Sequence, residues 1–460
     1  MMKRRILLIS LICLTIGVVA QEHSVLKLSL QQAQDYAIEH NKSLKNVRTD
    51  VAISKQKLWQ TIAQGLPQGS ATVDYTNFFN YEIEFGMGGS GSTPTIDFTK
   101  LDDGDLQILS FLQQSMGSGT TTIKMKNSSS AKLQVTQLIF SGQYFTGIQI
   151  AKVGQMLTDL NVVKSEIDIR ESVISTYYLG LLTQKSLEII DANLENLNKT
   201  LIQTTAMLNA GIIEETDVDQ LVMSINMLEN TRRSLLRNIE LNNNIMQFIL
   251  GIDGDVTIEL TESFENILKN MDVSDLLVSK FTPADNITIQ MMDKQTELTV
   301  KMLDLEKWNY APTIAGVYSH NEKLLTTDFD MNPKNLFSIN MSIPLFSSGI
   351  RHSKVEQKKL ELYQIQNNRE IISDQLLMQE KQLRYNLTSA LEQYESQKAN
   401  MELAQRIYNN TELKFRQGVA SSFDLIQANS NLLQAQNGYI SAAMELMQSK
   451  LKFDKLLNKI

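Results

Sequence analysis

The sequence predicts a mainly α-helical chain built from two duplicated halves, each with a pair of β-strands long enough to cross a membrane. A glycine turn occurs twice, as LNAGIIEETDVDQL from residue 208 and as FRQGVASSFDLIQA from residue 415. The long stretches before both turns lack proline and have helical periodicity. Other short stretches alternate apolar and polar residues with the period of two that is typical of strands.

The first twenty residues have the pattern of a secretory signal peptide. Lys3, Arg4 and Arg5 precede an apolar run that ends at the small residue Ala20, just before Gln21. This run has about 14 residues, whereas a helix needs roughly 20 to cross a bilayer. No later apolar run reaches that length. Contact with a membrane is therefore expected through β-strands or along the surface.

Composition excludes several classes of function. Cys13 is the only cysteine and lies in the predicted signal peptide, so we expect no disulfide, thiolate metal site or cysteine nucleophile. Removing three positive charges changes the formal net charge from -8 to -8 - 3 = -11, which argues against nucleic acid as a partner. The four histidines lack metal-ligand spacing, and no catalytic or phosphate-binding motif is present. We therefore expect neither an enzyme nor a cofactor.

Four segments are predicted to be strands. The clearest places Phe337, Ile339 and Met341 on one face, with serines and Asn340 on the other. Similar alternation is found near residues 73–79 and 132–139, and less cleanly at 313–320. About ten residues suffice for a tilted membrane strand, although one such strand fits a soluble sheet equally well. Four strands are too few to close a barrel, since single-chain barrels begin near eight, so membrane strands would require several chains.

The helices are unusually long. Residues 142–210 and 349–417 contain no proline, and about 68 helical residues span about 100 Å. In the first of these stretches, Ile190, Leu194 and Leu197 belong to a predicted coiled-coil seam. Shorter helices of about 37 residues are predicted near 29–65, 214–250 and 421–457, and two of them end to end match one long helix.

These elements divide the chain into eight predicted segments. They are a signal peptide (1–20), an N-terminal helical segment (21–70), a first strand pair with a long loop (71–140), a helical hairpin with its tip near 211 (141–250), a small segment packed around the helices (251–284), a helical segment (285–311), a second strand pair (312–346) and a second hairpin with its tip near 418 (347–460).

The chain resembles the TolC-like outer-membrane efflux proteins, also called outer membrane factors. The matching features are LSLQQAQDYAIEHNKSLK near the N-terminus, TQLIFSG and SIPLFSSG at the strand-to-helix transitions, and the two glycine turns. The resemblance implies a homotrimer in which four strands per chain form a twelve-stranded β-barrel among outer-membrane lipid. The barrel would continue into a long periplasmic α-helical barrel. The family is not enzymatic and serves efflux pumps or type I secretion systems of Gram-negative cells, together with a periplasmic adaptor protein and an inner-membrane transporter.

The resemblance also assigns roles at the turns. It makes Gly211, Ile212, Gly418 and Val419 the residues that dock the adaptor. It makes Asp424 a pore residue, three copies of which would form an acidic ring at the periplasmic entrance. From the residues alone, Asp424 and Asp217 are equally well explained as first-turn carboxylates at helix starts, with Ser421 and Asp424 spaced as a capping box.

This chain departs from the family pattern at three positions. Gln427 replaces the second acidic ring found in some members. The family latch joins a Thr-Asp pair, here Thr216 and Asp217, to a tyrosine and an arginine, but Phe415 and Ala420 occupy those positions. We expect the latch to be absent or built differently.

Two other classes of protein fit part of the sequence pattern. A secreted coiled-coil adhesin or structural stalk would explain the long helices and the signal peptide, but not the duplication or the strands. A diffusion porin would place most of its chain in strands. The sequence does not distinguish drug efflux, metal efflux and protein secretion.

Overall fold

The computed structural model describes residues 24–79, 81–86, 110, 120–124, 127–254, 256–271, 273–325 and 333–460. The predicted signal peptide and most of the predicted loop between residues 80 and 130 lie outside the described residues. The chain forms two compact units, a helical unit (residues 1–56, 152–300 and 360–460) and a sheet unit (residues 57–151 and 301–359).

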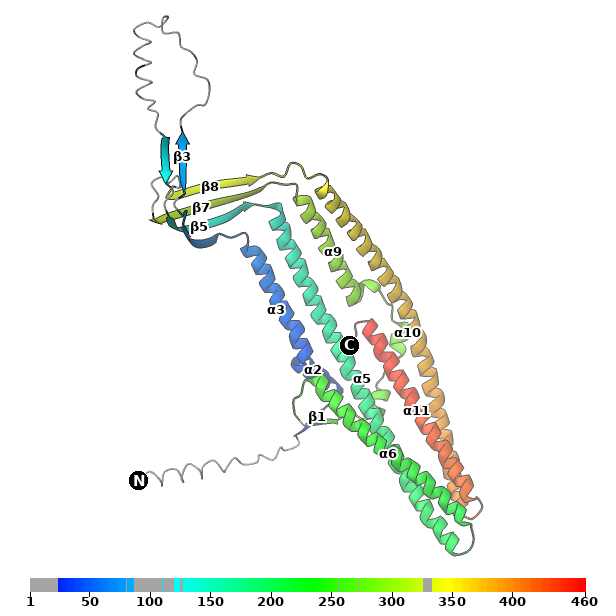
Figure 1. Cartoon of the computed structure of the whole chain (residues 1–460). Coiled ribbons are helices and arrows are strands. Elements are labelled where there is room, and N and C mark those ends of the chain that lie inside the picture. The colour runs from blue at the N-terminus through cyan, green and yellow to red at the C-terminus, as the bar shows by residue number, and fades with distance from the viewer. Residues whose placement is uncertain are drawn as a thin grey trace, which may run out of the picture. The chain divides into compact units, whose positions relative to one another are not determined.

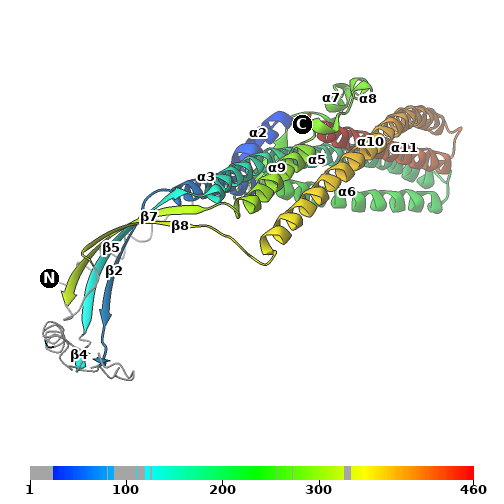
Figure 2. The same cartoon turned by 90° about the horizontal axis from the view of Figure 1, so that it is seen from above.

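The sheet unit contains one antiparallel sheet of four strands in the order β2-β5-β7-β8 (Figure 2). The strands are β2 (Gln68–Thr76), β5 (Ser128–Phe140), β7 (Thr313–Leu325) and β8 (Asn335–Ser342). A separate pair joins β3 (Glu82–Gly86) to β4 (Thr120–Lys124). The predicted mainly α fold class with four long strands per chain is confirmed. β7 ends at Leu325 and not at residue 320 as predicted. The alternation of apolar and polar residues in this strand is weak, so the sequence pattern does not mark its last residues.

The two faces of this sheet differ in polarity. The pairing register aligns Tyr318 with Val135 on one side and with Phe337 on the other. Phe337, Ile339 and Met341 are exposed by 68%, 61% and 56%, while the residues between them, Ser338 and Asn340, are polar. A contiguous exposed apolar face is unusual for a protein surrounded by water and marks a contact with lipid or protein.

Close packing joins the strands to the helices that follow them. Within the sheet unit, a Cβ atom on Gly142, at the start of α5 (Gly142–Asn209), would lie 2.1 Å from the Trp308 ring, so only glycine fits there. Trp308 ends α9 (Ile287–Trp308). The Tyr144 hydroxyl donates a hydrogen bond to the Ile62 carbonyl near the end of α3 (Lys42–Ala63) at 2.9 Å.

The helical unit is dominated by two antiparallel hairpins (Figure 1). α5 returns as α6 (Glu215–Leu250), and α10 (Ile350–Arg416) returns as α11 (Ser422–Leu456). The predicted seam residues Ile190, Leu194 and Leu197 are buried against α6, which is consistent with a coiled-coil seam. Among the described residues, no helix is both long enough and apolar enough to cross a membrane.

The predicted helix near residues 29–65 is in fact two helices, α2 (Leu30–His40) and α3. The break is at Asn41, whose Nδ2 donates to the Ile249 carbonyl at 2.7 Å and whose Oδ1 accepts from the Leu44 amide at 3.0 Å. The structure also contains a parallel pair that the sequence pattern does not predict, between β1 (Ser24–Leu28) and β6 (Val256–Leu260). Both features tie the N-terminal segment to the main helices.

The segment between the halves packs on the helical unit through α7 (Phe264–Lys269), α8 (Ser274–Val278) and η2 (Pro283–Asp285). Arg384 of α10 holds the end of α8, because its guanidinium donates to the carbonyls of Leu277 and Ser279. The same group pairs with Glu380 and lies 5.2 Å from the Phe453 ring centroid. One side chain thus satisfies two carbonyls at a helix end.

Arg384→Met is expected to loosen this segment without unfolding the hairpins. The loss of charged hydrogen bonds to both carbonyls should lower local stability by about 2 kcal/mol. Limited proteolysis between residues 256 and 286 should become faster, since cleavage follows local opening. Arg406→Met, at an exposed position on the same helix, is the control. Equal cleavage rates for both variants would contradict the assigned role of Arg384.

Candidate functional site

Both hairpin tips use the same glycine stop. Gly211 and Gly418 each have φ of +72°. The Gly211 amide donates to the Leu208 carbonyl at 2.8 Å, and the next amide donates to the carbonyl of Met207 at 3.0 Å. Gly418 and the residue after it repeat the pattern at 2.9 Å each. These are Schellman motifs, in which a left-handed glycine satisfies the last carbonyls of a helix.

The tips present open, apolar surface. A Cβ atom on Gly211 or Gly418 would meet no atom within 4 Å. The residues that follow, Ile212 and Val419, are exposed by 66% and 73%. Because exposed branched apolar side chains flank bare backbone, each tip has space for another backbone to approach closely.

Asp424 is part of the cap that starts α11. Its Oδ2 accepts hydrogen bonds from the Ser421 amide at 3.0 Å and hydroxyl at 2.7 Å, and the Ser421 hydroxyl accepts from the Asp424 amide at 3.1 Å. The predicted capping box is therefore confirmed. These bonds to Ser421 lower the pKa of Asp424. The carboxylate remains exposed to solvent.

Asp217 lies in the first turn of α6 and contacts the other hairpin. Its Oδ1 accepts a hydrogen bond from the hydroxyl of Ser422, which is 5% exposed. Thr216 is exposed, and its hydroxyl faces Glu214 at 3.4 Å within its own tip. The structure thus joins Asp217 to Ser422, while Asp424 bonds within its own tip.

Ser422 was not predicted from the sequence. The only signal was its position next to the capping residue Ser421, and nothing local indicates that its hydroxyl reaches another hairpin. Phe415 is buried and packs with Tyr408 and Leu425, and Ala420 packs against the same cluster. The positions that carry the family latch therefore contribute to the core of the second hairpin.

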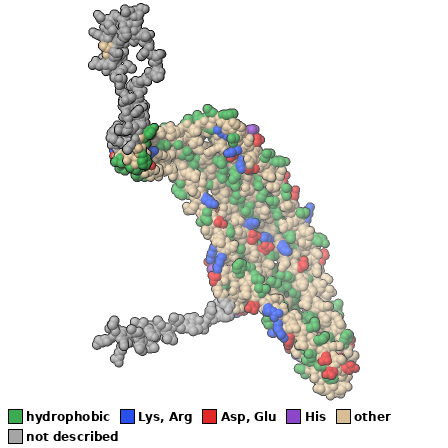
Figure 3. Space-filling model, in the orientation of Figure 1, with side chains coloured by type: hydrophobic (Ala, Val, Ile, Leu, Met, Phe, Trp, Pro, Cys, Tyr) green, Lys and Arg blue, Asp and Glu red, His purple; other side chains and the backbone are tan. Residues whose placement is uncertain are grey.

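The tips are rich in acidic side chains, which Figure 3 shows at the free end of the hairpins. The acidic residues that begin α6 and α11 are Glu214, Glu215, Asp217, Asp219 and Asp424. Basic residues are confined to the end of α10, where Arg416 pairs with Glu412. The start of each returning helix therefore presents negative charge.

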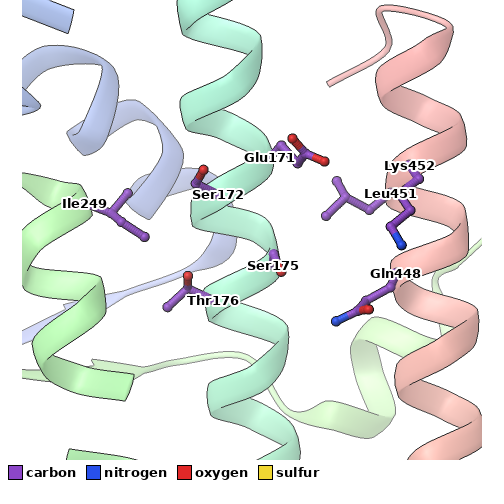
Figure 4. Close-up of a pocket in the computed structure, with 8 residues that line it drawn as sticks. All are labelled: Glu171, Ser172, Ser175, Thr176, Ile249, Gln448, Leu451 and Lys452. Atoms are coloured by element: carbon purple, nitrogen blue, oxygen red, sulfur yellow. The ribbon is translucent and has the colours of Figure 1, made fainter. Parts of the chain in front are cut away.

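A hollow of about 390 Å³ lies along α5 and α11, with Ile249 of α6 at its side (Figure 4). Its polar groups do not converge on one point. Glu171 pairs with Lys455 at 2.6 Å, and the Ser172 hydroxyl donates to the Asp168 carbonyl of its own helix at 2.9 Å. The hollow is therefore an open polar groove between α5 and α11.

The described residues contain no group of acidic, histidine or cysteine side chains able to hold a metal ion. His40 stacks on Tyr36 at 4.1 Å, while His320 lies in β7 and His352 in α10. His23 lies outside the described residues.

The fold is that of bacterial outer-membrane channels, as comparison with solved structures shows. CusC, described for transmembrane channel formation, has a TM-score of 0.72 at 13% identity, over 93% of this chain and 92% of that one. The outer membrane protein VceC of Vibrio cholerae gives 0.67 at 14% identity, over 93% and 95%. The CmeC outer membrane channel of Campylobacter jejuni gives 0.69 at 13% identity, over 94% and 85%.

Part of the sequence also matches a protein family. Residues 284–459 match the model of the outer membrane efflux protein family. No curated protein matches the chain. The C-terminal part of the chain therefore carries an outer membrane efflux protein domain, and the predicted resemblance to the TolC-like family is confirmed. This is a family of transport channels and not of enzymes.

Ser422→Ala is expected to separate the two tips. It removes a hydrogen bond to a carboxylate, a contribution of about 1.5–3 kcal/mol. Spin labels on cysteines at positions 215 and 417, with labelled chains diluted by unlabelled ones, should show a longer and broader distance distribution. Ser449→Ala, at a similarly buried serine of α11, should leave it unchanged. If Ser422→Ala also left it unchanged, the contact would not hold the tips together.

Proposed function

We propose that this protein is the outer-membrane channel-tunnel of a tripartite efflux pump or type I secretion system. It conducts substrates passively from the periplasm, or from an inner-membrane transporter, to the exterior of a Gram-negative cell. The observation that carries this proposal is the combination, in one chain, of a two-faced sheet with helices of 68 and 67 residues. Most of the chain would lie in the periplasm.

The sheet and the helices both support a homotrimer. Three copies of four strands give a twelve-stranded barrel with apolar residues toward lipid and polar residues inside. The helices expose apolar side chains that need a cover, among them Met223, Met227 and Phe248 of α6, and Met378 and Tyr385 of α10. Neighbouring copies would provide that cover. The alternative of an adhesin or stalk has no support, because a stalk has no use for the two-faced sheet.

The tips are the proposed docking surface for a periplasmic adaptor protein. Gly211 with Ile212, and Gly418 with Val419, combine open backbone with exposed apolar side chains. An apolar helical hairpin could pack closely there, as small residues allow helices to do. The inner-membrane transporter would connect through this adaptor.

Gly211→Trp and Gly418→Trp are expected to block adaptor-dependent export while the trimer still forms. The control is Gly254→Trp, because Gly254 also has positive φ, +101°, and open space around it, but lies outside the tips. Gly254→Trp also places a side chain at a residue with positive φ and therefore strains the backbone in the same way, but it leaves the docking surface unchanged. Export by all three variants at the wild-type rate would rule out docking at these turns.

Asp424 is proposed to form an acidic ring at the entrance, with Asp217 and Thr216 beside it in the first tip. Three carboxylates in one ring favour cations. In planar bilayers, the purified protein should form cation-selective channels, and Asp424→Asn should reduce that selectivity. The pKa of Asp424 is lowered by the hydrogen bonds from Ser421, so its carboxylate is protonated at a lower pH than an ordinary aspartate, whose pKa is about 3.9. Selectivity due to Asp424 should therefore be lost only at lower pH.

Glu402→Gln, at an exposed position on α10 away from the tips, is the matched control. Unchanged cation selectivity in Asp424→Asn would contradict the ring. Absence of any conductance from folded wild-type protein would contradict the proposed function itself.

A further inference from the structure

Exposed aromatic residues gather where the helices of the sheet unit meet its strands. The chain has two tryptophans. Trp59 lies near the end of α3 and Trp308 at the end of α9, exposed by 58% and 43%. Three more exposed aromatic residues lie within a few residues of a strand-to-helix transition. We call these five residues the junction belt: Trp59, Phe145, Trp308, Tyr310 and Phe346.

The junction belt continues the apolar face of the sheet. Phe140, the last residue of β5, is paired with Ile314 of β7. Its ring lies 6.5 Å from the rings of both Trp308 and Phe145. The apolar face therefore ends in aromatic rings, which is where membrane proteins place them, at the boundary between hydrocarbon and headgroups.

Basic side chains follow the belt at the start of α10. Arg351 donates to the Pro344 carbonyl at 3.0 Å, and its guanidinium lies 5.8 Å from the Tyr310 ring centroid. Lys354 is exposed and forms no ion pair within the described part of the chain. The first turn of α10 has no acidic residue. Positive charge at a helix start is unfavourable for the helix, so folding does not explain it.

The duplicated halves of the chain differ at this junction. Aligning FSG at residues 140–142 with FSSG at 346–349 places Arg351 opposite Tyr144 and His352 opposite Phe145. One half of the chain thus has aromatic residues at the positions where the other half has basic ones. Aromatic rings and long cations both favour the membrane boundary.

The depth of the basic residues fits a phosphate layer. β5 and β7 have 13 residues each, and 13 residues tilted by about 45° span about 30 Å, the thickness of the hydrocarbon core. Arg351 contacts Pro344, two residues after the end of β8, and Tyr310, three residues before the start of β7. Lys354 lies three residues further along the helix, or about 4.5 Å. The headgroup region adds about 5–8 Å on each side.

We propose that Arg351 and Lys354, next to the junction belt, bind the phosphate groups of membrane phospholipids around the barrel and fix the depth at which it sits. This inference rests on the proposed outer-membrane function. The expected ligand is a phospholipid and not free phosphate, because the basic residues are continuous with the apolar sheet face and free phosphate would not need the aromatic residues.

The two tryptophans allow a direct test by fluorescence quenching. The full mature protein is reconstituted in phosphatidylcholine vesicles that carry a nitroxide either on the headgroup or at mid-chain. The headgroup nitroxide should quench more strongly. Next, brominated phosphatidylglycerol should quench more than brominated phosphatidylcholine at the same mole fraction. An enrichment on the order of fivefold for each cation is expected.

Arg351→Gln with Lys354→Gln should remove the preference for phosphatidylglycerol. Lys354→Gln alone should reduce it, and this variant avoids the hydrogen bond of Arg351 to Pro344. Lys381→Gln, an exposed lysine further along α10, should keep the wild-type preference. Equal quenching by both lipids, stronger mid-chain quenching, or an unchanged preference in the double variant would overturn the inference.

The outcomes separate this inference from the proposed function. Channels that conduct but show no lipid preference would overturn the inference and leave the function intact. Folded protein that does not insert into the vesicles would overturn both.

Discussion

A four-stranded sheet with one apolar face and one polar face cannot satisfy both faces alone. The exposed Phe337, Ile339 and Met341 need an apolar neighbour, whereas Ser338 and Asn340 between them need water. The outer strands, β2 and β8, also leave unpaired backbone edges. Closure with further copies around a water-filled interior, within lipid, resolves all three problems. The proposed shared barrel, membrane location and channel each answer this constraint.

The helical unit is also built from two similar halves, each a long helical hairpin. Each hairpin buries its own apolar seam, as Leu194 does against α6 and Phe415 does against α11. Between the hairpins there are also polar contacts, such as Asn193 with Gln436 at 3.1 Å and Asp217 with Ser422. The hairpins also share an apolar core, because Val173 and Tyr177 of α5 lie in one buried cluster with Ala443 and Met447 of α11. Apolar and polar contacts together therefore hold one hairpin against the other.

The parts predicted from sequence are those whose signal is local. The lack of proline and the steps of three and four fixed the long helices, glycine fixed both tips, and the spacing of Ser421 and Asp424 fixed a capping box. The parts that were missed depend on distant partners. β1 pairs with β6 across 232 residues, and a strand of five residues has little pattern of its own. The bond of Ser422 to Asp217 and the contacts of Arg384 with α8 are likewise set by packing.

Cross-linking of the sheet edges tests the shared barrel most directly. Cysteines placed in pairs along β2 and β8, for example at Thr72 and Asn340, scan the possible registers in a chain whose only natural cysteine lies in the predicted signal peptide. If β8 of one copy pairs with β2 of the next, oxidation should give covalent dimers and closed trimers at registers two residues apart. Only monomers at every register, from protein that forms channels, would contradict a barrel shared between chains.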